Sequence, residues 1–372
     1  MESIIKEANL RTNTPTYNIS SKDRKKTEVD EALEKLVNQQ KAKIKVIGCG
    51  GGGGNTINRM SEVGIVGTET VAINTDAQDL LYTNADHKIL IGKELTGGLG
   101  AGSIPKVGEE AARESEKEIR ECLQNSDIIF ITCGMGGGTG TGSAPIVAEI
   151  AKKLNILTVA IVTIPFSMEG QRRRANADYG LEQLEKNADT LIIIPNDKLL
   201  DLCPGLPLHT AFKVADEILT NAVKGIAELV TKAGLVNLDF ADIKTVMSNG
   251  GAAMIGVGES DSENRALEAV EKAIQNPLLD VDISGATGAL INVSGGPNMT
   301  LDEAKQIVET VAERLDEDAR VIWGAQILED LDKTIRTLII ITGVHSTQIK
   351  GVSKIENKKK TQKYDLGIEF ID

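Results

Sequence analysis

The sequence has few residues of the kind that bind metals or form disulfides. Its 372 residues include only four cysteines and three histidines, and no two cysteines follow the spacing C-x-x-C. This pattern argues against the common zinc modules and against a disulfide framework. We therefore expect the cysteines to be buried, reduced thiols in a cytoplasmic protein.

Long hydrophobic runs and an excess of positive charge are also missing. No stretch of 18 residues is continuously apolar, and the first residues are polar with mixed charge. Both observations argue against a membrane span and a signal peptide. The chain carries 41 lysines and arginines against 54 acidic residues, a formal charge of −13. Because nucleic-acid binders usually present a basic surface, we expect no nucleic-acid partner. Because no long apolar run is present, we also expect no direct membrane insertion.

Glycine, in contrast, is concentrated in a few places. Sixteen of the 37 glycines lie in three short segments, which we call the first (48–54), second (134–142) and third (97–102) glycine loops. Because glycine lacks a Cβ atom, it suits a backbone that turns sharply or approaches a ligand closely. The three loops are therefore candidates for a binding site.

Apolar runs alternate with helical patterns along most of the chain, which predicts an α/β fold. We expect a Rossmann-like parallel sheet, joined by a long central helix to a smaller α+β domain with a mixed sheet. The last two predicted strands lie close together in the sequence, as in an antiparallel pair. The expected strands are 43–48, 70–74, 88–91, 127–132, 155–164, 190–195, 252–258, 289–294, 320–328 and 334–342.

The helical patterns complete this division of the chain. Between His209 and Ala233 apolar residues follow steps of three and four without a proline, which predicts one continuous helix. The expected parts are an extension, partly helical (1–40), a first domain (41–208), the connecting helix (209–233), a second domain (234–343) and a tail (344–372). The other expected helices cover 55–63, 105–124, a segment from 146, 171–187, 262–275 and 301–315.

The glycine loops match two nucleotide-binding motifs only in part. Gly48–Gly53 has the spacing G-x-G-x-x-G of dinucleotide-binding folds, but the acidic residue expected about 20 positions later fits Asp76 only approximately. The second glycine loop lacks the G-K-[ST] ending of a P-loop, because Thr139–Ser143 contains no lysine. Free N–H groups at a helix start and threonine hydroxyls can still hold phosphate. Three such loops at one edge of a sheet could share a di- or triphosphate.

Five motifs together resemble one family. They are Gly136–Gly142, Gly100–Gly102, Pro165–Gly170, Ile194–Lys198 and Gly234–Asp242. In order and spacing they are similar to the tubulin/FtsZ superfamily of GTPases, and in particular to its prokaryotic cell-division family. The resemblance covers roughly residues 40–343. It implies a GTPase that polymerises head to tail into protofilaments for the cell-division ring.

The resemblance also implies roles for individual residues. Ala101 and Gly102 would sense the terminal phosphate, and Glu169 and Arg173 would contact the ribose and nucleotide. Asn196 and Asp216 would read guanine, with Phe212 packed on the base. Mg²⁺ is expected as a counter-ion, with no protein ligand identified beyond Asp76 as one candidate. The residues implied to hold phosphates and nearby groups are Gly51, Gly52, Gly53, Gly54, Asn55, Gly137, Gly138, Thr139 and Gly140.

The residues themselves support part of this assignment. Phe212 and Asp216 are four positions apart on the long helix and therefore share a face. A carboxylate can accept both neighbouring N–H donors of guanine. Each side chain also has a simpler interpretation: Phe212 as a core aromatic, Asp216 as a solvated helix charge and Glu169 as a surface residue.

Hydrolysis needs groups that the glycine loops lack, namely a residue that orients water and charge that assists the reaction. Asn237, Asp239 and Asp242 form an acidic and amide cluster just beyond the long helix. An aspartate there could instead cap the next helix. The long helix has about 24 residues and spans about 36 Å. If its start reads guanine, this cluster is too far away to reach the phosphates of its own chain. The resemblance implies that a neighbouring subunit supplies it.

Other classes of function stay open at this point. A nicotinamide-dependent oxidoreductase would use the first glycine loop but leave the second and third unexplained. A nucleotide-binding scaffold without hydrolysis, or a paralogue with a role outside division, is also possible. The final Leu366–Asp372 is apolar and acidic. It is either a frayed end or docked strand, or a partner-binding motif, and our hypothesis is that it docks a membrane-attached adaptor at the mid-cell division site.

Overall fold

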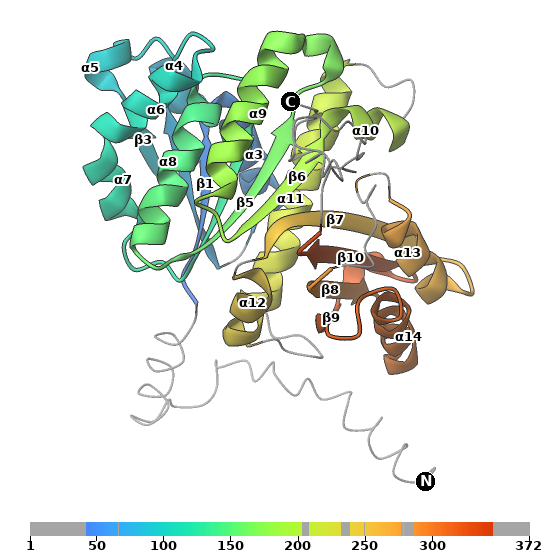
Figure 1. Ribbon diagram of the computed structural model, residues 1–372. Coiled ribbons are helices and arrows are strands. Elements are labelled where there is room, and N and C mark those ends of the chain that lie inside the picture. Colours follow the sequence, from blue (N-terminus) through green and yellow to red (C-terminus); the bar gives the residue numbers. More distant parts are fainter. Residues whose placement is uncertain are drawn as a thin grey trace, which may run out of the picture. The chain divides into compact units, whose positions relative to one another are not determined.

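The computed structural model describes residues 42–65, 67–202, 208–231, 239–248, 250–276, 278 and 286–344 (Figure 1). The chain divides into two compact units, Met1–Lys41 and Ala42–Asp372, and the fold below belongs to the second. The expected extension at 1–40 and nearly all of the tail lie outside the described residues. None of the described helices is long and apolar enough to cross a membrane.

Ten strands form one sheet in the order β3-β2-β1-β4-β5-β6-β7-β10-β8-β9. The neighbours from β3 to β7 pair in parallel, whereas β10 pairs antiparallel with both β7 and β8. The α/β prediction with a mixed second part is therefore confirmed. The strands are β1 (Ile44–Cys49), β2 (Thr68–Asn74), β3 (His87–Leu90), β4 (Ile128–Gly134), β5 (Leu157–Ile164), β6 (Thr190–Pro195), β7 (Gly251–Ser260), β8 (Gly288–Gly295), β9 (Arg320–Ile327) and β10 (Ile335–Thr342).

The predicted pairing of the last two strands is wrong. β9 pairs in parallel with β8 and lies at the edge of the sheet, and β10 lies between β7 and β8. Burial agrees with this strand order. The central β10 is mostly buried, while the edge strand β9 is partly exposed. The short connection between β9 and β10 suggested a hairpin. Instead, β10, the more apolar of the two strands, takes the buried central position.

Helices cover both faces of the parallel part (Figure 1). α6 and α8 pack together over one face, and α3 and α11 pack together over the other. The helices are α3 (Gly50–Val63), α4 (Ala77–Tyr82), α5 (Lys93–Thr96), α6 (Pro105–Glu114), α7 (Glu116–Leu123), α8 (Thr139–Lys153), α9 (Gln171–Glu185), α10 (Asn196–Leu202), α11 (Leu208–Thr231), α12 (Phe240–Met247), α13 (Arg265–Ile274) and α14 (Leu301–Ala312), with 3-10 turns η1 (Ser167–Glu169) and η3 (Glu329–Leu331).

Two helices begin earlier than the sequence predicted. α3 starts at Gly50 rather than residue 55, and α8 starts at Thr139 rather than near residue 146. Close packing explains the glycines: a Cβ on Gly53 would lie 2.7 Å from the carbonyl oxygen of Thr132 on β4. Most of the first glycine loop is therefore the first turn of α3, and the second glycine loop ends in the first turn of α8. The single helix expected at 105–124 is two helices, which meet at Ser115.

The long connecting helix is confirmed as α11, with 24 residues and thus about 36 Å of length. Its side chains at Ala222, Val223 and Ile226 are fully buried. They join a core that includes Phe130 of β4 and Leu290 of β8. α11 therefore packs against both the parallel and the mixed parts of the sheet.

Candidate functional site

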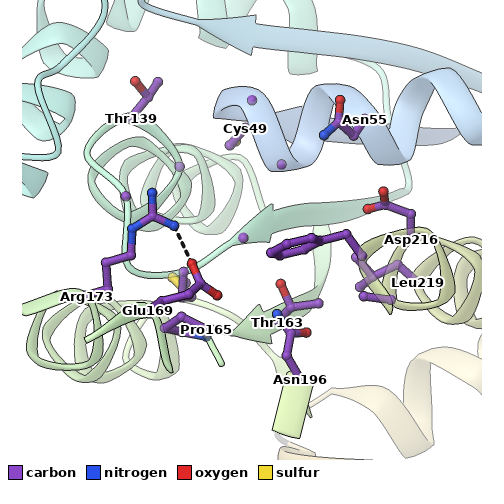
Figure 2. Close-up of a pocket in the computed structure, with 18 of the residues that line it drawn as sticks. Cys49, Asn55, Thr139, Thr163, Pro165, Glu169, Arg173, Asn196, Asp216 and Leu219 are labelled. Carbon is purple, nitrogen blue, oxygen red and sulfur yellow. Dashed lines mark hydrogen bonds and ion pairs between the residues drawn. The ribbon is translucent and has the colours of Figure 1, made fainter. Parts of the chain in front are cut away.

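A cavity of about 330 Å³ opens at the carboxyl ends of the parallel strands (Figure 2). In a parallel sheet this edge is the usual place for a ligand. The starts of α3 and α8 form one half of the cavity, and the ends of β5 and β6 with α11 form the other. The residues predicted from the sequence that line it are Gly51, Gly52, Asn55, Gly137, Gly138, Thr139, Gly140, Glu169, Arg173, Asn196, Phe212 and Asp216.

Two helix starts meet at one end of this cavity, which we call the phosphate end. Gly50 has φ +68°, and a Cβ there would lie 2.7 Å from the backbone nitrogen of Gly140. The first turns of α3 and α8 contain no acidic residue. Free N–H groups and the positive ends of two helix dipoles therefore favour an anion here.

The third glycine loop supports the second glycine loop from outside the cavity. A Cβ on Gly138 would lie 2.9 Å from the Cβ of Ala101. The backbone nitrogen of Gly100 donates to the carbonyl of Thr75 over 3.2 Å, and the hydroxyls of Thr75 and Thr139 lie 2.6 Å apart. Ala101 and Gly102 do not line the cavity, so their predicted contact with a terminal phosphate stays a prediction.

Glu169 and Arg173 lie side by side at the rim of the cavity and form an ion pair (Figure 2). Glu169 also accepts a hydrogen bond from the backbone nitrogen of Phe166 over 2.8 Å. The carboxylate side chain is only 15% exposed, while that of Arg173 is 51% exposed. Glu169 is thus held at the rim, in a position suited to a hydroxyl of a ligand, and Arg173 remains accessible.

The other end of the cavity, the base end, is built from side chains. Asn196 is 5% exposed, and its Oδ1 atom has no hydrogen-bond partner among the described residues. Phe212 packs edge-on against Phe166, with ring centroids 5.2 Å apart, yet it remains 40% exposed. A buried acceptor without a partner costs free energy, so this end is suited to a planar polar ligand.

Asp216 supplies the carboxylate of the base end. Burial raises the pKa of Asp216 from its ordinary 3.8 to about 6, and a hydrogen bond from the Thr56 hydroxyl opposes this rise. A partly buried carboxylate without a cation beside it is unfavourable. Donors from a ligand would relieve this cost.

The sequence missed several residues that line the cavity. Thr163 and Pro165 follow from the position of β5, since they lie at its carboxyl end. Ala215 and Leu219 are three positions after Phe212 and Asp216 on α11, so helical spacing could have found them. Gly53 and Gly54, which were predicted, are instead buried inside α3. The missed residues are Cys49, Gly134, Met135, Thr163, Pro165, Ala215 and Leu219.

The predicted acidic residues lie at the opposite edge of the sheet. Asp239 caps α12, accepting from the backbone nitrogen of Ala241 over 3.3 Å, and Asp242 is exposed in the first turn. The end of α12 is fixed by a 2.5 Å hydrogen bond from Thr190, the first residue of β6, to the carbonyl of Met247. α12 therefore lies at the amino edge of the parallel strands, away from the cavity. Asn237 lies outside the described residues.

The described residues contain no group of three or more acidic, histidine or cysteine side chains that could hold a metal ion. Within the cavity lining the acids are Glu169 and Asp216. Asp76 uses its Oδ1 atom to cap α4, accepting from the backbone nitrogens of Gln78 and Asp79 at 2.9 and 3.0 Å. Nothing in this geometry adds support for Asp76 as a metal ligand.

The comparisons with known proteins all indicate the same family. Residues 43–204 match the model of the Tubulin/FtsZ family, GTPase domain, and residues 251–345 match the FtsZ family, C-terminal domain. "Cell division protein FtsZ 1" of Thermococcus kodakarensis is 61% identical over 346 residues, covering 93% of this chain and 92% of that protein. The protein of the same name from Methanocaldococcus jannaschii is 62% identical over 317 residues, covering 85% of this chain and 87% of its own.

Solved structures agree with this result. The structure titled "FtsZ dimer, empty (M. jannaschii)" superposes with a TM-score of 0.82 at 62% identity, covering 86% of this chain and 93% of that one. The GDP-bound CetZ1 monomer from Haloferax volcanii has a TM-score of 0.72 at 24% identity, covering 83% of this chain and 96% of its own, and shares the fold. The chain therefore belongs to the FtsZ branch of the tubulin/FtsZ family of GTPases.

Proposed function

We propose that this GTPase holds GTP in the cavity, polymerises head to tail into protofilaments, and completes each hydrolysis site with a residue of the next subunit for cell division. The observation that carries this proposal is that two sets of predicted site residues lie at opposite edges of the sheet. Every requirement for binding a nucleotide lies at the carboxyl edge of the sheet, while the predicted acids lie at the amino edge.

The cavity accounts for nucleotide binding from one end to the other. At the phosphate end, backbone N–H groups of α3 and α8 hold phosphate oxygens, and the Thr139 hydroxyl adds a donor. At the base end, Asp216 accepts from two N–H groups of guanine, and Asn196 supplies amide groups. Phe212 offers its exposed face to the base. Family membership agrees with GTP and GDP and disfavours the nicotinamide alternative.

Among the described residues that line the cavity, none is placed to orient a water that attacks the terminal phosphate. Its two acids are committed elsewhere, because Glu169 is paired with Arg173 at the rim and Asp216 lies at the base end. A head-to-tail neighbour would bring its own α12 against the phosphate end. Contacts of this kind generate filaments when the rotation between subunits does not close. Asp242 then orients the water, with Asp239 close by.

Mg²⁺ fits this site as a counter-ion of the triphosphate. The described residues of the phosphate end offer backbone donors and hydroxyls but no acidic side chain. Mg²⁺ commonly keeps several water ligands and binds through substrate phosphates. We propose that phosphate oxygens and water hold most of its coordination sphere, where its charge offsets that of the phosphates.

The proposal also covers a binding partner and the location of the protein in the cell. We propose that it works in the cytoplasm at the mid-cell division site and that residues 366–372 dock a membrane-attached adaptor. These residues lie outside the described part of the chain. Deleting 364–372 should abolish binding to the adaptor and leave GTP turnover unchanged. Unaltered adaptor binding by the truncated protein would refute the assignment.

Two measurements test the proposal as a whole. GDP should raise the thermal unfolding temperature of the protein much more than ADP does, and GTP should produce light scattering from filaments. Turnover per subunit should then fall steeply as the protein is diluted below the concentration of assembly. A turnover per subunit that stays constant down to fully monomeric protein would contradict a site shared between subunits.

A further inference from the structure

Thr56 links the two ends of the nucleotide cavity. It lies on α3, one turn after Gly52, and its side chain is fully buried. Its hydroxyl lies 3.1 Å from the carbonyl oxygen of Gly52, a residue of the phosphate end. The same hydroxyl lies 3.4 Å from Oδ1 of Asp216 at the base end. Thr56 itself does not line the cavity.

A hydroxyl has a single proton to donate, so these two acceptors compete for it. The carbonyl of Gly52 already belongs to the α3 backbone and gains little from a second donor. A charged carboxylate is the stronger acceptor, because hydrogen bonds to ionised groups are about twice as strong as neutral ones. When Asp216 is ionised, the proton of Thr56 therefore points toward it.

We infer that Thr56 is a positioning residue for guanine recognition, which donates to one carboxylate oxygen of Asp216 and thereby holds that carboxylate ionised and oriented toward the base. This inference rests on the proposed role of Asp216 and adds the residue that sets its charge and direction. The remaining lone pairs of the carboxylate accept the two N–H donors of guanine. Thr56 acts through Asp216 and makes no contact with the nucleotide.

The neighbourhood of Asp216 leaves this task to Thr56. Burial and the Thr56 hydroxyl are the causes that shift the pKa of Asp216, and no charged group among the described residues contributes. On α3, Arg59 pairs with Glu217 at 2.6 Å. Across the cavity, Glu169 pairs with Arg173. Among the described side chains, the other charged groups on α11 are Lys213, Glu217, Lys224 and Glu228, and those on α3 are Arg59 and Glu62. Elsewhere around the base end they include Glu169, Arg173, Asp197 and Lys198.

The test measures the affinity of the full-length protein for GDP between pH 5 and pH 8. Thr56→Val keeps the shape and branching of the side chain but removes the donor. It should weaken GDP binding about three- to tenfold at pH 7. It should also move the pH at which affinity falls to a higher value, because the ionised carboxylate loses its hydrogen bond. Thr56→Ser retains the hydroxyl and should keep the wild-type midpoint.

A matched control separates positioning from simple helix packing. Glu217→Gln removes the neighbouring ion pair between α3 and α11 but leaves Thr56 and Asp216 in place. It should lower thermal stability without moving the pH midpoint. If Thr56→Val leaves the midpoint unchanged, or if Thr56→Ser moves it equally, the inference is wrong. Failure of the wild-type protein to prefer GDP over ADP would instead overturn the proposed function itself.

Discussion

The two edges of the parallel sheet differ in how they are built. The carboxyl edge is a cavity whose phosphate end is made mostly of backbone, with glycine at the contacts where two helix starts meet. The amino edge presents α12, a short helix with one exposed acid, Asp239, at its N-cap and another, Asp242, in its first turn. Under the proposed function, the carboxyl edge binds the nucleotide and the amino edge supplies the acids for hydrolysis. If the proposal holds, the two halves of the hydrolysis site lie at opposite edges of one subunit, and assembly is required to join them.

The amino edge should control turnover and leave binding unchanged. Asp242→Ala is expected to lower GTP turnover by roughly a hundredfold or more, because an oriented water is lost. GDP affinity and filament formation should remain at wild-type values. Steady-state turnover and light scattering on the same samples measure this. Weaker GDP binding in Asp242→Ala would mean that the two edges are not separate in function.

The base end should control which nucleotide binds. Asp216→Asn is expected to weaken GDP binding by roughly a hundredfold, because the amide replaces an acceptor with a donor and loses the charge. The same change should allow xanthosine diphosphate, whose C2 carbonyl can accept from the new amide. Competition binding with both nucleotides measures this. Equal loss of affinity for GDP and xanthosine diphosphate would contradict the assignment.

The pKa of Asp216 adds a dependence of stability on pH. The pKa is about 6 in the folded protein and 3.8 ordinarily, so the folded state binds more protons between these values. This carboxyl therefore stabilises the fold at low pH, and its contribution is lost as pH rises through about 6. Without nucleotide, Asp216→Asn should be more stable than wild type at pH 8 and similar at pH 4. Denaturant unfolding at both values tests the sign.

The phosphate end should depend on close backbone contact. Gly50→Ala places a Cβ 2.7 Å from the backbone nitrogen of Gly140. This contact is too close, so the starts of α3 and α8 must move apart. We expect nucleotide affinity to fall at least about tenfold. Gly64→Ala is a matched control, because Gly64 ends the same helix with φ +72° but has no atom within 4 Å of its Cβ position. That variant should lose about 1 kcal/mol of stability and retain full affinity.

The smallest effect separates the two roles of Asp239. Asp239→Ala removes the cap of α12 and should cost about 1 kcal/mol of stability. Asp239→Asn keeps a capping oxygen but removes the charge, so it should be nearly as stable as wild type. Turnover that falls in both variants points to a part in hydrolysis. If GTP turnover falls only in Asp239→Ala, the variant that loses stability, Asp239 acts only as the cap of α12.

The sequence predicts the parallel sheet and α11 because these depend on local patterns, whereas most of the predicted cavity-lining residues were implied by the family resemblance. Apolar runs such as 190–195 mark buried strands, and helical spacing places Phe212 and Asp216 on one face. It did not predict the position of β9, which depends on competition among strands distant in the chain. Nor did it reveal Thr56 beside Asp216, since that contact joins residues 160 positions apart.

The central claim is that one subunit supplies the pocket and another supplies the acid. Its most direct test mixes Asp242→Ala, which has an intact pocket, with Asp216→Asn, which has an intact acid but binds GTP poorly. Each variant alone should show little GTP turnover. A one-to-one mixture should recover roughly a quarter of the wild-type rate, since half of the pockets hold GTP and half of their neighbours carry the acid. No recovery in filaments shown to contain both variants would contradict the account.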